Sequence, residues 1–213
     1  ASFVVGKKVN IKWVDSDSVT DATAPEVFKD CAGIILPGGF GNRGIEGMIC
    51  ACRYARVNKL PYFGICLGMQ IAVIEYARTV LGYEDANSRE FDEMCAHPVI
   101  DLMKDQEGVI MGGTMRLGKY PCKVVPGTIL ESAYKSKEIE ERHRHRYEFN
   151  NDFREELTKA GLIISGTSPD EKLVESVEVA DHFHIGVQFH PEFKSRPNNA
   201  GPLFVEFVKA CVK

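Results

Sequence analysis

The apolar positions of the chain follow two periods, one typical of strands and one typical of helices. Residues 9–15 (VNIKWVD) alternate apolar and polar side chains over most of their length, which predicts a strand. The short apolar runs 32–36 (AGIIL) and 61–65 (PYFGI) predict strands that are buried on both faces. Apolar residues recur at helical spacing over 43–58, and the stretch 67–82 predicts a second helix that ends at a glycine.

The second half of the chain continues with loops, two more strands and a closing helix. Residues 95–150 are richer in glycine and polar side chains, which predicts hairpins and active-site loops. Residues 152–161 (DFREELTKAG) predict a helix with an aspartate near its start and a glycine at its end. The runs 172–179 (KLVESVEV) and 184–189 (HIGVQF) predict strands, and 201–212 predicts the last helix.

The order of these elements predicts the architecture. Strands that alternate with helices through tight glycine turns indicate an α/β fold with a doubly wound, mostly parallel central sheet flanked by helices. We find no internal repeat or linker and expect residues 1–213 to form a single domain. The segment 2–6 (SFVVG) also resembles a strand, although almost nothing separates it from the strand predicted at 9–15.

Charge and cysteine content narrow the classes of function. The net charge of −4 argues against a broad surface for nucleic acid or anionic membrane. The sequence has no leader pattern and no apolar run near 18 residues, so we expect a cytoplasmic protein that does not enter the membrane. Seven cysteines without the spacing of a disulfide framework indicate reduced thiols, and the pair Cys50 and Cys52 has no matching second pair for a metal site.

Cys66 stands in FGICLGMQ, at the predicted junction of a strand and a helix. Glycines two positions before and after it, Gly64 and Gly68, match a nucleophile elbow, in which the nucleophile occupies a strained turn. The start of the following helix favours a thiolate there. The alternative is a cysteine that merely fills the core, which is the usual place of a free cysteine.

A histidine and a glutamate follow the strand predicted at 184–189, in the motif GVQFHPEF. Pro191 holds His190 in extended backbone, where residues two apart point the same way, so Glu192 can approach the imidazole. A carboxylate that orients a histidine beside a cysteine is the arrangement of a catalytic triad. The alternative is a surface His-Pro turn with a solvated glutamate.

The glycines of LPGGFGNRG, residues 36–44, follow the first buried strand. Their backbone N–H groups could stabilise an oxyanion together with the N–H of Leu67. They could instead serve only the turn, or cradle a phosphate, since Gly39, Gly41 and Gly44 loosely fit the dinucleotide fingerprint. That last interpretation lacks the acidic residue expected at the end of the second strand.

Together these three motifs resemble the class I, triad-type glutamine amidotransferase family, whose domains have a flavodoxin-like α/β fold. The resemblance covers the chain from about residue 9 to its end. Three further stretches narrow it to the C-terminal glutaminase domains of the CTP synthase family: ANSREFD (86–92), GGTMRLG (112–118) and ERHRHRYEFN (141–150).

The resemblance implies hydrolysis of the side-chain amide of L-glutamine to glutamate and ammonia. In that family pattern Cys66 is the nucleophile that forms a thioester, His190 is the acid and base, and Glu192 orients His190. The backbone N–H groups of Gly39 and Leu67 would form the oxyanion hole.

The same resemblance implies how glutamine is bound. Glu90 would meet the substrate ammonium and Arg146 its α-carboxylate, with Gln70 and Phe40 lining the pocket beside Gly39 and Leu67. Arg116 resembles a position connected with activation by GTP. Without the motifs around them, Glu90 and Arg146 would be interpreted as solvated surface charges.

The run 142–147 (RHRHRY) is also typical of two other kinds of site. It could be a basic patch for nucleic acid, or His143 and His145 could bind a metal. On a strand the three arginines would share one face and the two histidines the other. Because one basic run in an acidic protein is a weak signal, we expect neither nucleic-acid binding nor a metal site.

The family implies partners beyond this chain. Its ammonia passes to an N-terminal amidoligase domain, which uses ATP and Mg²⁺ to aminate UTP in pyrimidine biosynthesis, with GTP as activator, in homotetramers. Nothing here resembles that domain or an ATP-binding GKS loop, so we expect no cofactor in this domain and weak glutaminase activity in isolation. The rival hypotheses are a non-catalytic partner-binding module, another class I glutaminase, and a cysteine peptidase or γ-glutamyl hydrolase on the same fold.

Overall fold

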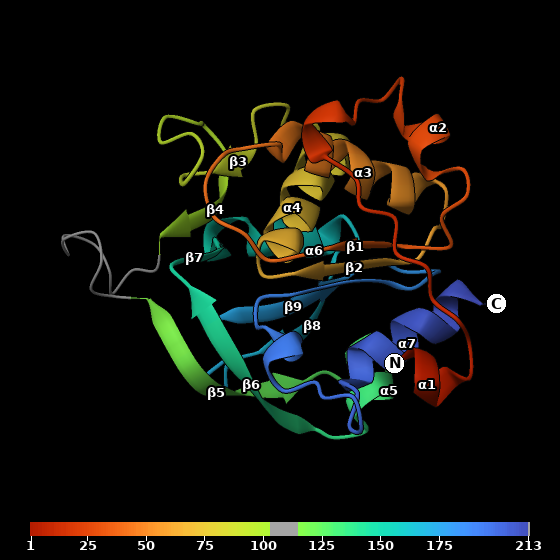
Figure 1. The fold of residues 1–213 in the computed structure, drawn as a ribbon. Coiled ribbons are helices and arrows are strands. Elements are labelled where there is room, and N and C mark those ends of the chain that lie inside the picture. Colours follow the sequence, from red (N-terminus) through yellow and green to blue (C-terminus); the bar gives the residue numbers. More distant parts are fainter. Residues whose placement is uncertain (103–114, 213) are drawn as a thin grey trace.

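The computed structural model describes residues 1–102 and 115–212, so the first three residues of GGTMRLG lie outside the described part. Figure 1 shows a curled sheet with helices on both of its faces. The main sheet has seven strands within the described residues, in the spatial order β1-β2-β10-β9-β8-β5-β6. Their bounds in chain order are β1 Ile34–Leu36, β2 Tyr62–Ile65, β5 Arg116–Val124, β6 Glu138–His145, β8 Ile163–Thr167, β9 Val174–Glu178 and β10 His184–Val187.

Only part of this sheet is parallel. Strands β1, β2 and β10 pair in parallel, whereas every other pairing in the sheet is antiparallel. The α/β class is confirmed, but the description of the sheet as mostly parallel needs correction. The links β8–β9 and β9–β10 have only a few residues, and a parallel crossover needs a dozen or more.

A small second sheet lies beside the main one. Its strands are β3 Asn87–Ser88, β4 Pro98–Leu102 and β7 Tyr147–Phe149, in that spatial order. Because β7 follows β6 after a single residue, Arg146 stands where the chain passes from one sheet to the other.

The helices divide between the two faces of the main sheet (Figure 1). Helices α3 Ile45–Val57, α4 Leu67–Tyr76 and α6 Arg154–Lys159 cover one face, and α5 Ile129–Tyr134 and α7 Pro202–Cys211 cover the other. Successive side chains of β2 point to opposite faces of the sheet and so contribute to the apolar core on each face. Tyr62 belongs to the larger apolar cluster, and Phe63 belongs to the smaller one under α7. The helix predicted over 67–82 is confirmed, with π-helical geometry over Ala77–Leu81 and a left-handed Gly82 at its end.

The N-terminal segment differs from the prediction. Residues 9–15 form neither helix nor strand, and Trp13 is 88% exposed there. Alternation alone does not make a strand, because a strand needs a sheet edge to pair with. The segment 2–6 forms the short helix α1 Ser2–Val5, and α2 Ala24–Phe28 follows later. Strand β8 was not predicted at all.

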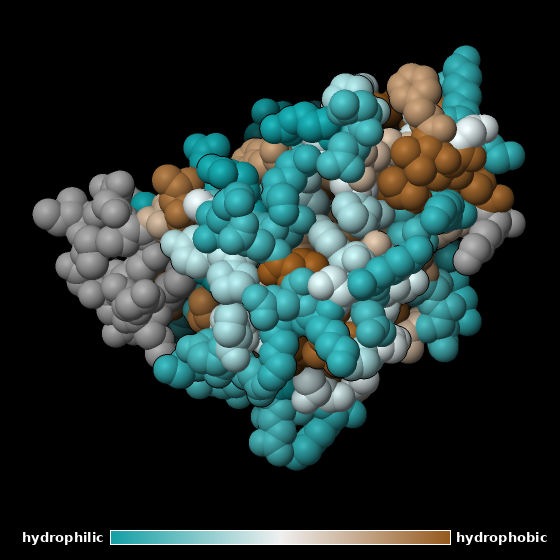
Figure 2. Space-filling model, turned by 90° about the horizontal axis from the view of Figure 1, so that it is seen from below, coloured by the Kyte–Doolittle hydropathy of each residue, from teal (hydrophilic) through white to brown (hydrophobic). Residues whose placement is uncertain are grey.

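No helix among the residues that the structure describes is long and apolar enough to cross a bilayer. Figure 2 shows a face with mostly polar side chains, and its hydrophobic atoms gather chiefly on the side where α1 and the end of α7 lie. Helix α1 contributes Phe3 and Val4 to the exposed apolar surface.

Candidate active site

The strand–helix junction at Cys66 is an elbow, as the glycine spacing predicts. Cys66 has φ 51° and ψ −99°, between the end of β2 and the first residue of α4. A Cβ on Gly64 would lie 2.5 Å from the carbonyl oxygen of Gly68, and one on Gly68 would lie 2.3 Å from the carbonyl oxygen of Leu36. Both glycines are therefore required by close backbone approach, and they allow a strained backbone that costs about 1–3 kcal/mol.

The sulfur of Cys66 is buried and surrounded by polar groups. It lies 3.6 Å from Nε2 of Gln188 and 3.9 Å from the carbonyl oxygen of Arg144. The backbone N–H of Cys66 donates to the carbonyl of Val187 at 2.7 Å, which ties the elbow to β10. Neighbouring strands thus fix the sulfur at the carboxyl end of the parallel part of the sheet.

His190 and Glu192 form the pair that the sequence predicts. Nδ1 of His190 lies 2.6 Å from Oε1 of Glu192, and the imidazole stacks on Phe193 with ring centres 4.7 Å apart. The backbone N–H of His190 donates to the carbonyl of Arg142 at 2.7 Å, which holds the histidine against β6.

The histidine and the cysteine meet above the glycine turn. A Cβ on Gly38 would lie 2.7 Å from Cε1 of His190 and 3.5 Å from Cβ of Cys66. The imidazole and Cys66 both lie close to Gly38, and they leave too little room for a larger side chain at this position. Nε2 of His190 is buried and has no hydrogen-bond partner among the described residues.

The pKa of His190 reflects these neighbours. Burial lowers it, but hydrogen bonding and charge interaction with Cys66 and Glu192 outweigh burial and raise the pKa to about 9. The imidazole is therefore protonated at neutral pH.

The two residues expected to supply the oxyanion-hole amides pack against each other. A Cβ on Gly39 would be 3.0 Å from Cδ2 of Leu67, so the glycine turn packs directly on the first residue of α4. The N–H of Leu67 belongs to the first turn of that helix, where backbone donors have no intrahelical acceptor.

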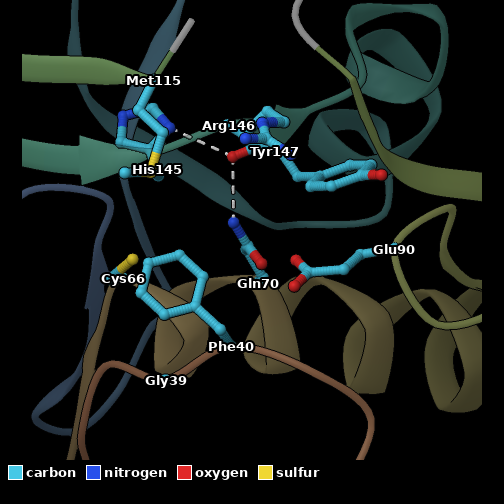
Figure 3. Close-up of a pocket in the computed structure, with 9 residues that line it drawn as sticks. All are labelled: Gly39, Phe40, Cys66, Gln70, Glu90, Met115, His145, Arg146 and Tyr147. Carbon is cyan, nitrogen blue, oxygen red and sulfur yellow. Dashed lines mark hydrogen bonds between the residues drawn. The ribbon is translucent and has the colours of Figure 1, made fainter. Parts of the chain in front are cut away.

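A cavity of about 100 Å³ opens beside the sulfur. Figure 3 shows the side chains around it, with Glu90 on the side away from Cys66 and Gln70 between the two. Oε1 of Glu90 accepts a hydrogen bond from the N–H of Gly41 at 3.1 Å. Burial raises the pKa of Glu90 above its ordinary value, although the Gly41 hydrogen bond and the charge of Arg146 oppose that rise. The lining residues are Gly39, Phe40, Cys66, Gln70, Glu90, Met115, His145, Arg146 and Tyr147.

Every residue predicted to bind glutamine except Leu67, which packs on Gly39, thus lines this cavity. The sequence reasoning missed Met115, Tyr147 and the role of His145 as a wall residue. It also missed Gln188, although a signal was present: Gln188 lies two residues before His190 on the same extended run, so both side chains point toward the elbow.

Arg116 lies beneath the cavity wall and not in it. Its side chain is 7% exposed, its Nη1 is 2.6 Å from Oε1 of Glu175, and its guanidinium lies over the ring of Tyr120. One nitrogen of the buried guanidinium is therefore engaged by Glu175.

The histidines of RHRHRY are buried, and Arg142 and Arg144 are exposed, so the predicted alternation along β6 is confirmed. Nδ1 of His143 lies 3.0 Å from Nε2 of His145. Burial and the nearby Arg116 lower the pKa of His143 to about 2 and that of His145 to about 3, so both rings are neutral.

Comparison with known proteins identifies the family of the chain. A family model described as glutamine amidotransferase class-I matches residues 2–210. The CTP synthase of Clostridium beijerinckii is 58% identical over 96% of this chain and 39% of its own length. For the CTP synthase of Staphylococcus aureus (strain JH9) the identity is 53%, over 100% of this chain and 40% of the relative.

A solved structure extends the likeness to three dimensions. The glutaminase domain of Trypanosoma brucei CTPS, with bound acivicin, has a TM-score of 0.92 and 41% identity, covering 99% of this chain and 83% of that one. The chain belongs to the class-I glutamine amidotransferase family. Within that family, it is similar to the glutaminase domain of CTP synthases. It spans about two fifths of the length of the curated relatives that it matches.

Proposed function

We propose that this chain is the glutaminase domain of a CTP synthase and that Cys66, His190 and Glu192 are its catalytic triad. The observation that carries the proposal is the strained elbow at Cys66, with the His190–Glu192 pair against the same glycine turn. The likeness to CTP synthases supports the choice of reaction. Because all three triad positions hold chemically competent residues, a binding module without activity is disfavoured.

The reaction follows from the protonation states. With the imidazole of His190 protonated, Cys66 attacks the side-chain carbonyl of glutamine as a thiolate. The N–H groups of Gly39 and Leu67 stabilise the resulting oxyanion. The imidazolium gives its proton to the departing ammonia, which leaves a γ-glutamyl thioester on Cys66. His190 then takes a proton from water, and the hydroxide displaces the thiolate to release glutamate.

Two charges in the cavity suit the amino-acid end of the substrate. Glu90 would bind the ammonium, and Arg146 would pair with the α-carboxylate. In Figure 3 both residues line the cavity, with Glu90 on the side away from the sulfur, so a glutamine between them would extend its amide toward Cys66. Phe40 and Gln70 would border the aliphatic part of the substrate.

The rest of the reaction lies outside this chain. We propose that ammonia passes to an N-terminal amidoligase domain that aminates UTP with ATP and Mg²⁺, with GTP as activator, in a cytoplasmic homotetramer. The likeness to much longer CTP synthases supports such a joined domain. Arg116 pairs with Glu175, and its role in activation by GTP stays a prediction. Isolated glutaminase activity is expected to be weak.

The proposal is tested by combining this chain with the purified amidoligase half of a related CTP synthase. We expect glutamine to support CTP formation only when this chain is present, whereas ammonium salts support it with or without the chain. γ-Glutamyl peptides should release no ammonia. Ammonium-dependent CTP formation without any glutamine-dependent formation, or efficient cleavage of γ-glutamyl peptides, would argue for a different activity.

A further inference from the structure

A continuous set of buried hydrogen bonds reaches the sulfur of Cys66 from the side opposite the glycine turn. Its centre is the carbonyl oxygen of Tyr147, which lies 3.1 Å from Nδ1 of His145 and 3.0 Å from Nε2 of Gln70 (Figure 3). The same Nε2 of Gln70 lies 3.3 Å from Oε1 of Gln188, whose Nε2 lies 3.6 Å from the sulfur. Four parts of the chain therefore contribute to one network: the end of β6, β7, α4 and the residue that follows β10.

The network has a fixed direction because its centre is a carbonyl, which only accepts hydrogen bonds. Gln70 must turn its NH₂ group toward Tyr147, and the second hydrogen of that group points at Gln188. Gln188 must then present its oxygen to Gln70 and its own NH₂ group to the sulfur. The amide next to Cys66 is thus a hydrogen-bond donor by necessity.

The hydrogen bonds of His143 and His145 also point toward the carbonyl of Tyr147. His145 donates from Nδ1 to Tyr147, so its Nε2 is an acceptor in the neutral ring and receives the Nδ1 hydrogen of His143. Both rings are almost fully buried, at 1% and 2% exposure. The carbonyl of Tyr147 therefore stays in place without help from solvent.

We propose that Gln188 is the hydrogen-bond donor that holds the sulfur of Cys66 in position and stabilises its thiolate. The inference rests on the proposed role of Cys66 as nucleophile. Gln188 is 1% exposed, so its N–H approaches the sulfur from within the protein. Hydrogen bonds to a charged group are stronger than those between neutral groups, so the donor favours the thiolate over the thiol.

The test is the pH dependence of Cys66 alkylation by iodoacetamide, followed on the Cys66 peptide by mass spectrometry. Gln188→Met keeps the length of the side chain and removes the donor. The midpoint of the profile is expected to move upward by roughly one pH unit, the equivalent of one charged hydrogen bond. The matched control Ser176→Ala removes a buried hydrogen bond to the carbonyl of Gly186 on β10 and should leave the midpoint unchanged.

Gln70→Glu tests the direction of the network separately. A carboxylate there cannot donate to Gln188, whose amide loses its fixed orientation, so the midpoint should again move upward. Circular dichroism checks that each variant is folded. An unchanged midpoint in a folded Gln188→Met or Gln70→Glu protein overturns the inference. The proposed function is tested separately, with a glutamine-directed electrophile. If that reagent fails to label Cys66 in the wild-type protein, the proposed function is refuted, whereas the iodoacetamide midpoints still report on Gln188.

Discussion

Lowering the pH from 7 to 5 is expected to reduce the free energy of unfolding by about 3 kcal/mol. Three histidines are buried and neutral: the pKa is lowered, chiefly by burial, to about 2 for His143 and about 3 for His145 and His184. In the unfolded chain the same groups bind protons below about pH 6.5. Each histidine therefore contributes stability that is present above pH 6.5 and is lost as the pH falls toward its folded pKa, about 2 kcal/mol by pH 5.

Other groups oppose part of this loss. Burial raises the pKa of Glu175 to about 6, so its protonation stabilises the folded state as the pH falls from 6 to 4.5. Burial also raises the pKa values of Glu90, Glu141 and Glu178, which act in the same direction. His190 has a raised pKa of about 9; its contribution is complete below pH 6.5 and is lost as the pH rises through 9.

Urea denaturation at pH 7 and pH 5 measures the change directly. His184→Phe is an informative variant, because the imidazole stacks on Tyr62 with ring centres 4.5 Å apart and a phenyl ring keeps that contact. The variant should lose about 2 kcal/mol less than wild type between the two pH values. If His184→Phe loses as much stability as the wild-type protein between the two pH values, His184 is not held neutral in the folded state.

Replacement of His190 by Asn is expected to slow glutamine-dependent CTP formation by about 10³-fold when the amidoligase half is supplied. The variant loses the imidazolium that stabilises the thiolate of Cys66 and the proton donor for departing ammonia. The side chain of Asn is smaller than the imidazole, so the clearance at Gly38 is kept.

Ammonium-dependent CTP formation is the control for that variant, because it bypasses the glutaminase and should keep its wild-type rate. Phe193→Leu is a second control: it removes the ring stacked on the imidazole but leaves the Glu192 contact, so we expect a much smaller effect. A His190→Asn protein that retains glutamine-dependent activity within tenfold of wild type would exclude His190 as the acid and base.

Local features of the site could be predicted from sequence because local sterics determine them. A sharp turn from a strand into a helix leaves no room for side chains two positions before and after the nucleophile. The close backbone contacts of Gly64 and Gly68 show that this holds here. The His190–Glu192 pair depends only on two residues of extended chain around a proline. Glu90 and Arg146 came from the family resemblance, and the structure places both at the cavity.

Features that depend on distant partners were not predicted. The strand expected at 9–15 has the right alternation but no edge to pair with, and β8 became visible only through its pairing with β5 and β9. Similarly, the sequence gives no sign that Arg116 is engaged by Glu175, some 60 residues later, in the protein interior. The orientation of Gln188 depends on Gln70 of α4, whose amide also donates to the carbonyl of Tyr147.

The most direct test of the account is reaction of the wild-type protein with an electrophilic glutamine analogue, followed by intact-mass and peptide mass spectrometry. One equivalent should add to Cys66 and to none of the other six cysteines, and excess glutamine should protect it. Cys66→Ala should gain no mass. Absence of an adduct in the wild-type protein, or an equal mass gain in Cys66→Ala, would contradict the assignment of Cys66 as the nucleophile.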